Sequence, residues 1–598
     1  MSEFLVVVGE GSRAESWFER GVRAAERAGA GAPGREIRGP RVRVAAWPRR
    51  AKPGLAAASS GRRWLIASGS WFADDGTQVG DEAALLRALA DRGAEAVASG
   101  LEGFFALAVG DEREATIVTE PIGSRHVYVR DGDGVTAAGT SALVLAALDD
   151  TALDPIGCQE FLATGVMYED RTPYAAVRAL PPASIVALDA GRWRVSARSW
   201  SIRRLQPETL DAGEAVEAFG SAMLAVGRRL ARAFARPVAD LTAGWDSRIL
   251  CAFLRGSAVS FETTVTGTAD EPDVVLSTRI AQRLGLQHRV IPSGAAPDFD
   301  EISRSLTLTD GLCNALGYAR VYRVHRELAQ RFDASLNGSF GEVARGYWWE
   351  LLGPTPAASA PLDAEHIARR RYAAGAPALA LWPTAERLEP VPHFAGVLRR
   401  LDGELASAPL AFRLDRAYLR MRMRCWQGRI ASSTDRLWPC LSPLIFRSAL
   451  EPLLRTKADV RLRNRFARRV LARFAPDLAR LPLESGGPAS PMTPWNAWRF
   501  LPEAFGFAGK VVRKLTGQRT YARTLEETAA PRLALWRDDR LRDALDPQRM
   551  ELGAHVDRDA LAGLLAATRE PEFGHELVFG NLLALELGLR RLRTLRHG

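Results

Sequence analysis

The sequence predicts two domains: a strand-rich α+β domain over residues 1–205 and an α/β domain with a doubly wound parallel sheet over residues 213–598. First, 598 residues exceed the ~250–300 at which a single hydrophobic core stops growing. Second, short apolar runs separated by charged turns fill the first third of the chain, as in antiparallel β structure. Third, strand-like and helix-like segments alternate after residue 213, which indicates a parallel sheet covered by helices.

The first domain opens with an apolar run at 4–9 that is typical of a buried strand. Further strand-like runs lie at 64–72, 103–111, 115–119, 126–129, 178–188 and 193–195, and helix-like spacing occurs at 81–90 and 155–164. A connector rich in glycine, proline and arginine at 30–62 separates the first two strands. A polar segment at 201–212 links the two domains.

The second domain has the alternation of a parallel sheet. Its predicted helices cover 213–234, 273–284 and 316–331, and its predicted strands cover 238–241, 259–267, 288–291 and 334–338. Ligands bind beyond the carboxyl ends of the strands in such sheets. We therefore expect the turn at 242–244 and the strand ends at Thr266, Gly267, Asn337 and Gly338 to share one ligand-binding rim.

The last part of the chain is predicted to be helical from about residue 360 and is rich in arginine. An irregular stretch at 484–497 indicates a loop, and an apolar run at 579–589 indicates a closing helix. Two aromatic groups, at 347–349 and 495–498, are candidates to line a cavity large enough for a peptide; the alternative, which is more common for tryptophans near a domain seam, is a place in the core.

The sequence is organised around the segment 238–248, Val-Ala-Asp-Leu-Thr-Ala-Gly-Trp-Asp-Ser-Arg. It predicts a strand, a tight turn of small residues, and a helix that begins near Asp246. Such a turn exposes backbone N–H groups at a helix N-terminus, where the helix dipole favours an anion. Gly244 lets the backbone approach that anion closely, and the Asp246 carboxylate suits a divalent cation bound to phosphates. The alternative is an ordinary turn with a capped helix.

The predicted ligand of this segment is ATP with Mg²⁺. The residues expected to hold it here are Leu241, Thr242, Ala243, Gly244, Asp246, Ser247 and Arg248. For Arg248, a surface position without a ligand is the alternative.

Composition excludes several other classes. With 47% hydrophobic and 25% charged residues, the chain resembles an ordinary folded protein. Its net charge is +10, but arginines are spread along the whole chain, so no nucleic-acid-binding face is predicted. The five cysteines lie far apart without metal-ligand spacing and are expected to be buried thiols. No signal-peptide pattern and no apolar run of ~18 residues occurs, so a cytoplasmic protein without a membrane span is expected.

Three stretches of the second domain together resemble the asparagine-synthetase family of ATP-pyrophosphatase enzymes. Residues 241–247 are similar to that family's Ser-Gly-Gly-x-Asp-Ser loop, with threonine and alanine replacing the serine and the first glycine. Residues 261–267, and the helix from Asp273 that ends in 281–288, resemble the strand that carries the adenine contact and the helix after it. Residues 337–347 resemble the second phosphate-side motif, Gly-Glu-Gly-Ser-Asp-Glu-x-x-x-Gly-Tyr.

The first domain resembles the glutaminase half of the same family, which has an N-terminal-nucleophile (Ntn) hydrolase fold. The similar stretches are 103–111, 120–128 and 180–184, and 435–444 resembles a later family segment. The resemblance implies an Ntn-glutaminase-like domain followed by an asparagine-synthetase-like ATP-binding domain.

The sequence departs from the family at the glutaminase nucleophile. The family uses a cysteine that is exposed when the initiator methionine is removed, but here Ser2 follows Met1 and no cysteine precedes Cys158. A hydroxyl is far less ionised than a thiol near neutral pH, so we expect a silent glutaminase. Without ammonia from glutamine, the amine must come from the substrate itself.

The phosphate-side motif also departs from the family. Gly341 stands at the position of the family's second Mg²⁺-binding aspartate, and Gly338 at the position of its catalytic glutamate. Glu342 is then the nearest carboxylate, and we expect it to act with Asp246 as the catalytic and Mg²⁺-binding pair. The family's transition-state lysine is absent from 458–509; the candidates for its charge are Lys457, Arg480 and Arg499.

The resemblance implies an ATP-dependent ligase that converts a carboxylate into an acyl-adenylate and joins it to an amine, releasing pyrophosphate and AMP. A silent glutaminase half suits ring closure within one substrate, as in lasso-peptide cyclases and β-lactam synthetases. We expect a lasso-peptide cyclase, which joins the α-amine of a precursor peptide to an Asp or Glu side chain and works with a leader peptidase and a leader-binding protein. The alternatives are a β-lactam synthetase-like enzyme, an ammonia-using asparagine synthetase-like ligase, and a non-catalytic scaffold that binds nucleotide or peptide.

Overall fold

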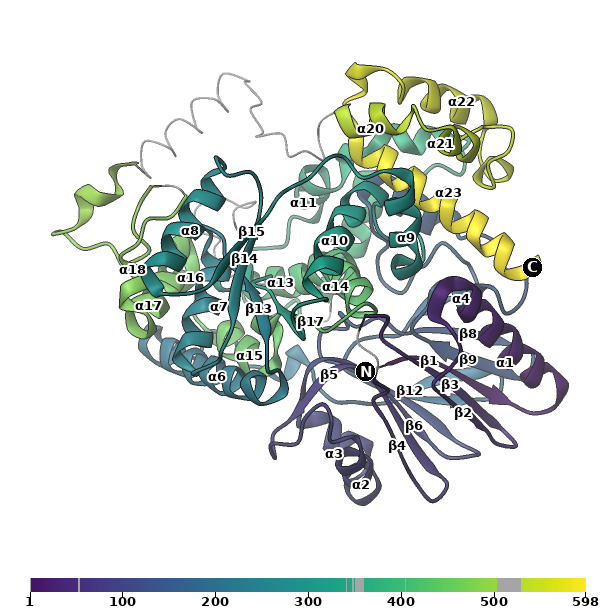
Figure 1. Cartoon of the computed structure of the whole chain (residues 1–598), viewed down its shortest axis with the longest axis horizontal. Helices are drawn as coiled ribbons and strands as arrows, with labels where there is room; N and C mark the ends of the chain where they lie inside the picture. Colours follow the sequence, from purple (N-terminus) through teal and green to yellow (C-terminus); the bar gives the residue numbers. More distant parts are fainter. Residues whose placement is uncertain are drawn as a thin grey trace.

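The computed structural model describes residues 2–51, 54–339, 341–346, 349, 360–403, 405–484, 486–502 and 529–597. Figure 1 shows a strand-rich N-terminal part at the lower right and a smaller sheet surrounded by helices to its upper left. The C-terminal helices, drawn in yellow, run back towards the N-terminal part.

The N-terminal part is a sandwich of two antiparallel sheets. The first has the strand order β10 (Arg178–Ala179), β8 (Tyr128–Gly132), β9 (Val135–Gly139), β1 (Ser2–Gly9), β3 (Val42–Pro48), β2 (Arg35–Arg38). The second has the order β12 (Arg192–Arg198), β11 (Ser184–Asp189), β7 (Ala115–Thr119), β6 (Leu101–Gly110), β5 (Arg63–Ala73), β4 (Ala57–Ser60). Strand β1 is apolar throughout because both its faces are buried: Phe4, Val6 and Val8 face the other sheet, whereas Leu5 and Val7 pack with helices.

Helices cover the outer faces of both sheets. They are α1 (Gly11–Ala25), α4 (Ala142–Ala146) and α5 (Pro155–Thr164) on the first sheet, and α2 (Glu82–Arg92) and α3 (Ala94–Ser99) on the second. The result is a four-layered α+β domain, as the strand pattern predicted. Its last strand ends at Arg198 and the next long helix begins at Ala212, while the exact domain limits stay a prediction.

The second domain is built on a parallel five-stranded sheet. Its order is β15 (His288–Ile291), β14 (Glu262–Thr266), β13 (Pro237–Asp240), β16 (Ala334–Leu336), β17 (Cys440–Leu441). Helices α6 (Ala212–Ala233) and α7 (Trp245–Gly256) pack on one face, and α10 (Ala315–Leu328) and α14 (Gly428–Asp435) on the other. The predicted doubly wound α/β fold is confirmed.

The chain after residue 360 is mostly helical, as predicted. The longer helices are α11 (Ala364–Arg371), α12 (Pro390–Gly403), α13 (Leu410–Ala417), α15 (Arg447–Arg455), α17 (Arg465–Phe474), α22 (Arg558–Ala567) and α23 (Glu576–His597). A π-helical stretch, η6 (Tyr418–Gln427), continues α13 into α14. Helix α23 packs on α4 and α5 of the first domain and on α9 (Phe299–Thr309) and α10 of the second, so it joins the two. Among the helices of the described residues, none has the length and apolar character needed to cross a membrane.

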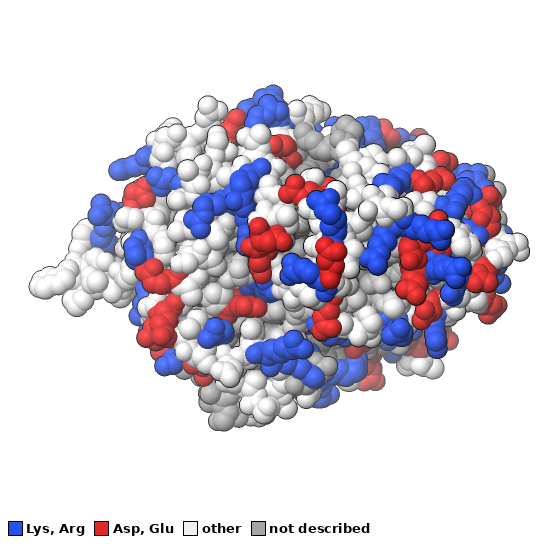
Figure 2. Space-filling view, turned by 90° about the horizontal axis from the view of Figure 1, so that it is seen from below, with Lys and Arg blue, Asp and Glu red and all other residues white. Residues whose placement is uncertain are grey.

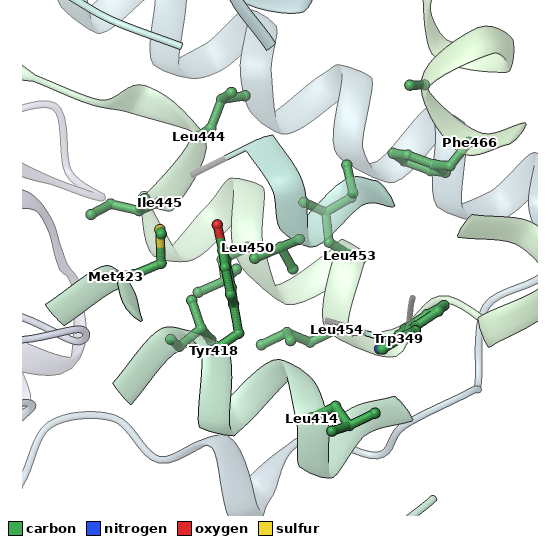
Figure 3. Packing of buried hydrophobic residues seen from close by; sticks show 14 of the residues in the cluster. Trp349, Leu414, Tyr418, Met423, Leu444, Ile445, Leu450, Leu453, Leu454 and Phe466 are labelled. Carbon is green, nitrogen blue, oxygen red and sulfur yellow. The ribbon is translucent and has the colours of Figure 1, made fainter. Parts of the chain in front are cut away.

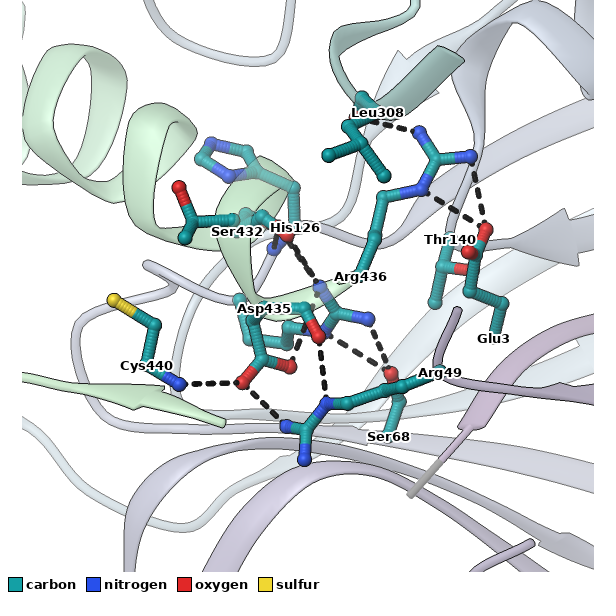
Figure 4. A network of polar contacts seen from close by, with 12 residues as sticks. Glu3, Arg49, Ser68, His126, Thr140, Leu308, Ser432, Asp435, Arg436 and Cys440 are labelled. Carbon is teal, nitrogen blue, oxygen red and sulfur yellow. Dashed lines mark hydrogen bonds and ion pairs between the residues drawn. The ribbon is translucent and has the colours of Figure 1, made fainter. Parts of the chain in front are cut away.

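A buried network of charges also joins the domains (Figure 4). Asp435, at the end of α14, accepts hydrogen bonds from Arg49, which follows β3, and lies 3.7 Å from the Arg125 guanidinium. Its neighbour Arg436 pairs at 2.8 Å with both Glu3 on β1 and Asp310 after α9. Because all these side chains are withdrawn from water, losing one partner would strand a buried charge. The two domains therefore form one unit.

Candidate active site

The turn after β13 is held by its own side chains. The Ser247 hydroxyl accepts a hydrogen bond from the Thr242 N–H at 3.0 Å and lies 3.0 Å from the Thr242 hydroxyl. That Thr242 hydroxyl accepts from the Gly244 N–H at 3.1 Å. Gly244 has an extended conformation and is the N-cap of α7, so the turn leads directly into the helix. Small hydroxyl residues thus fix a strand–turn–helix in which Trp245 is the first residue of the helix.

Asp273 anchors this turn from the neighbouring helix. It lies in the first turn of α8 (Pro272–Leu284), and its Oδ1 accepts a hydrogen bond from the Ala243 N–H at 3.0 Å. The N–H of Leu241 donates to the carbonyl of Thr264 on β14 at 2.9 Å. The turn is therefore positioned by the adjacent β–α unit. The sequence pattern gave Asp273 no role of its own.

Asp246 is the central charged group of the site. One carboxylate oxygen accepts a hydrogen bond from Arg345 at 2.7 Å, and the other, Oδ1, is buried and has no partner among the described residues. Burial raises the pKa of Asp246 to about 6; Arg345 opposes this shift and the charge of Glu342 adds to it. A buried acceptor without a partner costs free energy, so Oδ1 is suited to a bound cation or donor.

Arg345 is the cation that the structure places at Asp246. It ends the short helical turn η3 (Gly341–Arg345), which also carries Glu342. Burial opposes its charge, but the Asp246 carboxylate outweighs burial, and the pKa of Arg345 is raised. The three candidates for this charge in the sequence are all exposed, and the ion pair of this carboxylate is with Arg345 instead; the candidates are Lys457, Arg480 and Arg499. The signal for Arg345 was its place in the motif at 337–347.

Glu342 lies on the other side of the same turn and accepts a hydrogen bond from the Tyr418 hydroxyl. Burial, and then the Glu342 carboxylate, raise the pKa of Tyr418. Figure 3 shows the Tyr418 ring among apolar side chains of the surrounding helices, including Leu450 and Leu454. The structure therefore brings Asp246, Arg345, Glu342 and Tyr418 together, although Tyr418 was not predicted.

Two glycines of the same motif make close contact with α7. A Cβ atom on Gly338 would lie 2.5 Å from the Ser247 nitrogen, and one on Gly341 would lie 2.4 Å from Cγ of Asp246. Real Cβ contacts are not that short, so only glycine fits at both positions. In this chain, a larger side chain at either position would push on the first turn of α7.

The remaining predicted residues lie on the same rim of the sheet. The Asn337 Oδ1 accepts hydrogen bonds from the Ser339 N–H at 3.2 Å and from the Ser442 hydroxyl at 2.5 Å, so this side chain holds the turn after β16. Thr266 is exposed at the end of β14, and the Gly267 N–H donates to the carbonyl of Ile291 at 3.0 Å. Contact of these residues with ATP stays a prediction.

Arg248 is placed differently from the sequence expectation. It is fully buried, and its guanidinium donates to the carbonyls of Leu481 at 3.0 Å and Pro482 at 2.8 Å. Burial lowers its pKa to about 10. These hydrogen bonds connect the first turn of α7 to the segment after α18 (Pro476–Ala479). A direct contact of Arg248 with phosphate stays a prediction.

The two aromatic groups considered for a peptide cavity are placed differently from each other. Trp349 is buried in the core, where its Nε1 donates to the Ala411 carbonyl at 3.2 Å and the Arg461 guanidinium lies 4.5 Å from its ring centre. Tyr347 and Trp348 lie outside the described residues. Trp495 and Trp498 are exposed on the surface.

The donors at Asp246 fit a nucleotide-bound Mg²⁺ better than an independent metal site. Carboxylate oxygens are the side-chain ligands that Mg²⁺ prefers, and it usually takes its other ligands from phosphates and water. Asp246 offers the unpartnered Oδ1, with Glu342 near enough to influence its pKa. Within the described ranges, no group of three or more His, Cys, Asp or Glu side chains is arranged to hold a metal.

The N-terminal domain contains no thiol at the start of β1. Cys158 is buried, and burial raises its pKa above the range of a reactive thiolate. Between the sheet and α14, the Arg125 guanidinium donates to the Ser68 hydroxyl at 2.6 and 3.0 Å and to the Ser432 carbonyl at 2.8 Å. Arg125 therefore fills this part of the interface between the two domains and bonds to both of them.

Comparison with known proteins shows which type of domain the N-terminal domain is. A family model described as a glutamine amidotransferase domain matches residues 72–200. The first domain is therefore of the Ntn glutamine amidotransferase type, as its double antiparallel sheet indicates. The search of curated proteins finds no match.

Two solved structures show low similarity. One is a glutamine phosphoribosylpyrophosphate amidotransferase from B. subtilis complexed with ADP and GMP, at 11% identity and TM-score 0.24, covering 48% of this chain and 65% of that one. The other is described as the allosteric regulatory enzyme of purine biosynthesis, at 10% identity and TM-score 0.23, covering 50% of this chain and 82% of that one. The alignment thus spans less than two thirds of the first structure, and at these scores neither likeness bears on function.

Proposed function

We propose that this protein is an ATP-dependent, AMP-forming carbon–nitrogen ligase that closes a macrolactam ring in a ribosomal lasso-type peptide. The observation that carries the proposal is the Asp246 carboxylate at the start of α7. Its Oδ1 is buried and unpartnered among the described residues, and it lies beside a turn of small hydroxyl residues. This combination suits a triphosphate with its cation.

In the proposed reaction, a substrate Asp or Glu carboxylate attacks the α-phosphorus of ATP, and pyrophosphate leaves. The peptide α-amine then attacks the acyl carbon, AMP leaves, and the amine loses one proton. The N–H groups of the first turn of α7, residues 245–247, would hold the pyrophosphate part of ATP, because those of Thr242, Ala243 and Gly244 are already bonded within the protein. Asp246 and Glu342 would hold Mg²⁺, which when bound supplies charge neutralisation at the phosphates. Catalysis of this kind depends on positioning and fixed charge.

Arg345 has a defined part in this proposal. It is the one cation that forms an ion pair with Asp246 in the described part of the chain, and it lies on the glycine-rich turn next to the start of α7. A cation bound at Asp246 would compete for the carboxylate, which frees the Arg345 guanidinium to face phosphate oxygens. Arginine matches phosphate geometry through its fork of donors.

The source of the amine follows from the N-terminal domain. Its glutamine amidotransferase type would normally supply ammonia, but no cysteine occurs before Cys158 in the sequence. An amine within the substrate removes the need for ammonia. A precursor peptide, and with it a leader peptidase and a leader-binding protein, are the partners that this proposal requires.

The test is product analysis with the full-length protein, ATP and Mg²⁺. A peptide with glycine first and Asp or Glu at about position 7–9 should lose one water and give equal amounts of AMP and pyrophosphate. The Asp246→Ala variant should fold normally and give neither product. AMP formation only with aspartate and ammonium would instead indicate an ammonia-using ligase. ATP binding without AMP from any substrate would indicate a scaffold.

A further inference from the structure

A large cleft lies between the start of α17 and the segment 491–501. Its volume is about 1010 Å³. One wall is formed by residues 463–469 and the other by Pro491, Met492, Leu501 and their neighbours. The segment at 491–501 projects from the left edge of the molecule in Figure 1.

The first wall of this cleft is strongly basic. Arg463, Arg465 and Arg469 are exposed and have no ion-pair partner within the described part of the chain. Arg468 is buried beneath them and donates to the backbone carbonyls of 488 and 490. The described lining contains no Asp or Glu. Three exposed arginines on one wall favour an anionic occupant.

The second wall is apolar and open to solvent. Met492 is 61% exposed and Leu501 is 52% exposed, and Trp495 beside them is 91% exposed. Most of the face in Figure 2 mixes basic and acidic residues, whereas the tip of the projection at its left edge is white on the side shown; Arg499 is the charged residue of this segment. Exposed apolar side chains clustered in one segment typically mark a binding surface.

The backbone at the basic wall is strained. Arg463 and Asn464 have φ values of +53° and +59°, which place two consecutive non-glycine residues in the left-handed region. Both line the cleft, at the turn that begins α17. Such strain persists where the surrounding structure enforces it, and it is commonly found at ligand-binding sites.

The cleft is in contact with the candidate active site. The Arg468 guanidinium lies 5.0 Å from the ring centre of Trp245, the first residue of α7, and 4.9 Å from that of Phe500. Arg468 therefore connects the cleft wall to the residue before Asp246. A chain bound in the cleft would lie next to the segment that we propose to hold ATP.

We infer that this cleft binds an acidic, apolar segment of the peptide substrate and holds the peptide while its carboxylate is activated. The inference rests on the proposed function. It adds the location of the peptide-binding site and the chemical character of the peptide segment that binds there. Carboxylates of the peptide would pair with Arg463, Arg465 and Arg469, and its apolar side chains would pack on Met492 and Leu501. The occupant we infer is a peptide, because the second wall of the cleft is mainly aliphatic and suits packing of apolar side chains; the exposed Trp495 and Trp498 of the same segment could stack on bases, so the test includes a nucleic acid.

Fluorescence anisotropy with the full-length protein tests this inference. The probe is a fluorescein-labelled dodecapeptide of aspartate, leucine and glycine; one control peptide has asparagine in place of aspartate, and a dodecamer of uridylate tests nucleic acid. The double variant Arg465→Glu/Arg469→Glu should bind the acidic peptide at least about tenfold more weakly than the wild type. Met492→Ser, which leaves the charge unchanged, should weaken binding about threefold.

The matched control for charge is Arg192→Glu/Arg194→Glu. Both residues are exposed on β12 of the first domain, and the double change alters the net charge by the same amount. Peptide affinity in this control should stay within about twofold of the wild type. Equal affinity in the cleft variant and the wild type, no binding of the acidic peptide, or binding of uridylate alone would overturn the inference. Thermal melting verifies that each variant is folded.

The two proposals can fail separately. Binding in the cleft is measured without ATP, so it is independent of Asp246. Loss of peptide binding in Arg465→Glu/Arg469→Glu without AMP formation by the wild type would refute the ligase and leave the peptide site. AMP formation with a peptide substrate and unchanged KM in this variant would refute the site and leave the ligase.

Discussion

Gly338→Ala should disable the site through a single methyl group. The added Cβ would lie 2.5 Å from the Ser247 nitrogen and 2.6 Å from the Asp246 carbonyl carbon, whereas ordinary contact begins at 3.4 Å. Both neighbours are backbone atoms of the first turn of α7, so relief requires that the turn or the strand end moves by nearly an ångström. Overpacking of this kind costs about 1–3 kcal/mol of folding free energy. A displacement of that size at a reacting group can cost about a hundredfold in rate.

The assay for Gly338→Ala is the rate of pyrophosphate release, together with urea unfolding. We expect release to fall about a hundredfold and the free energy of unfolding to fall by about 1–3 kcal/mol. The matched control is Gly563→Ala in α22, where a new Cβ meets nothing within 4 Å. That change should leave the rate unaltered and raise stability by about 0.5–1 kcal/mol. A Gly338→Ala variant with full activity and stability would refute the proposed packing of the turn against α7.

Three further changes test the charged groups. Burial raises the pKa of Asp246 to about 6 in the free protein, and binding of ATP with its cation requires the ionised form. We therefore expect kcat/KM for ATP, which reports the free enzyme, to fall as the pH is lowered through about 6. Arg345→Met removes the charge that opposes this shift, so the acid limb of the kcat/KM profile should move to higher pH; an unmoved limb would contradict the pairing. Asp435→Asn should destabilise the protein by about 3–5 kcal/mol in urea unfolding, since it leaves Arg49 and Arg125 buried without their carboxylate; a loss below about 1 kcal/mol would contradict the role of the network. The wild type should hydrolyse no glutamine, and Ser2→Ala should release pyrophosphate at the wild-type rate. Glutaminase activity that is measurable in the wild type and lost in Ser2→Ala would instead show that Ser2 is a working nucleophile.

Local sequence patterns were sufficient to predict the strand, turn and helix that form the site. The apolar run ending at Leu241, the small residues after it and the helix from Asp246 specify a strand–turn–helix within a dozen residues, and the structure has it. The same holds for β1 and for α6, which the apolar spacing over 213–234 predicts. Short-range periodicity carries this information.

Contacts between distant segments were not predictable in the same way. Arg345 reaches Asp246 across 99 positions of sequence, and Asp273 reaches Ala243 across 30. The buried position of the Arg248 side chain could not be predicted either, because the carbonyls that it bonds to lie more than 200 residues later in the chain. Pairing of this kind depends on how the elements pack, which no single segment encodes.

Some elements were missed for local reasons. The prediction of a connector over 30–62 is wrong, because this stretch contains the strands β2, β3 and β4. Strand β2 is half-exposed at a sheet edge and β4 has only four residues, so neither has a strong apolar pattern. Strand β17 has two residues, which is too short for any periodicity, and it is specified by its pairing with β16.

The most direct test of the central claim is a crystal structure of the full-length protein with Mg²⁺ and a non-hydrolysable ATP analogue. The account predicts the triphosphate over the turn at 242–247, with a cation at Asp246 Oδ1 and the Arg345 guanidinium released from that carboxylate. Nucleotide bound elsewhere, or an empty turn with the Arg345–Asp246 pair intact at saturating nucleotide, would contradict it.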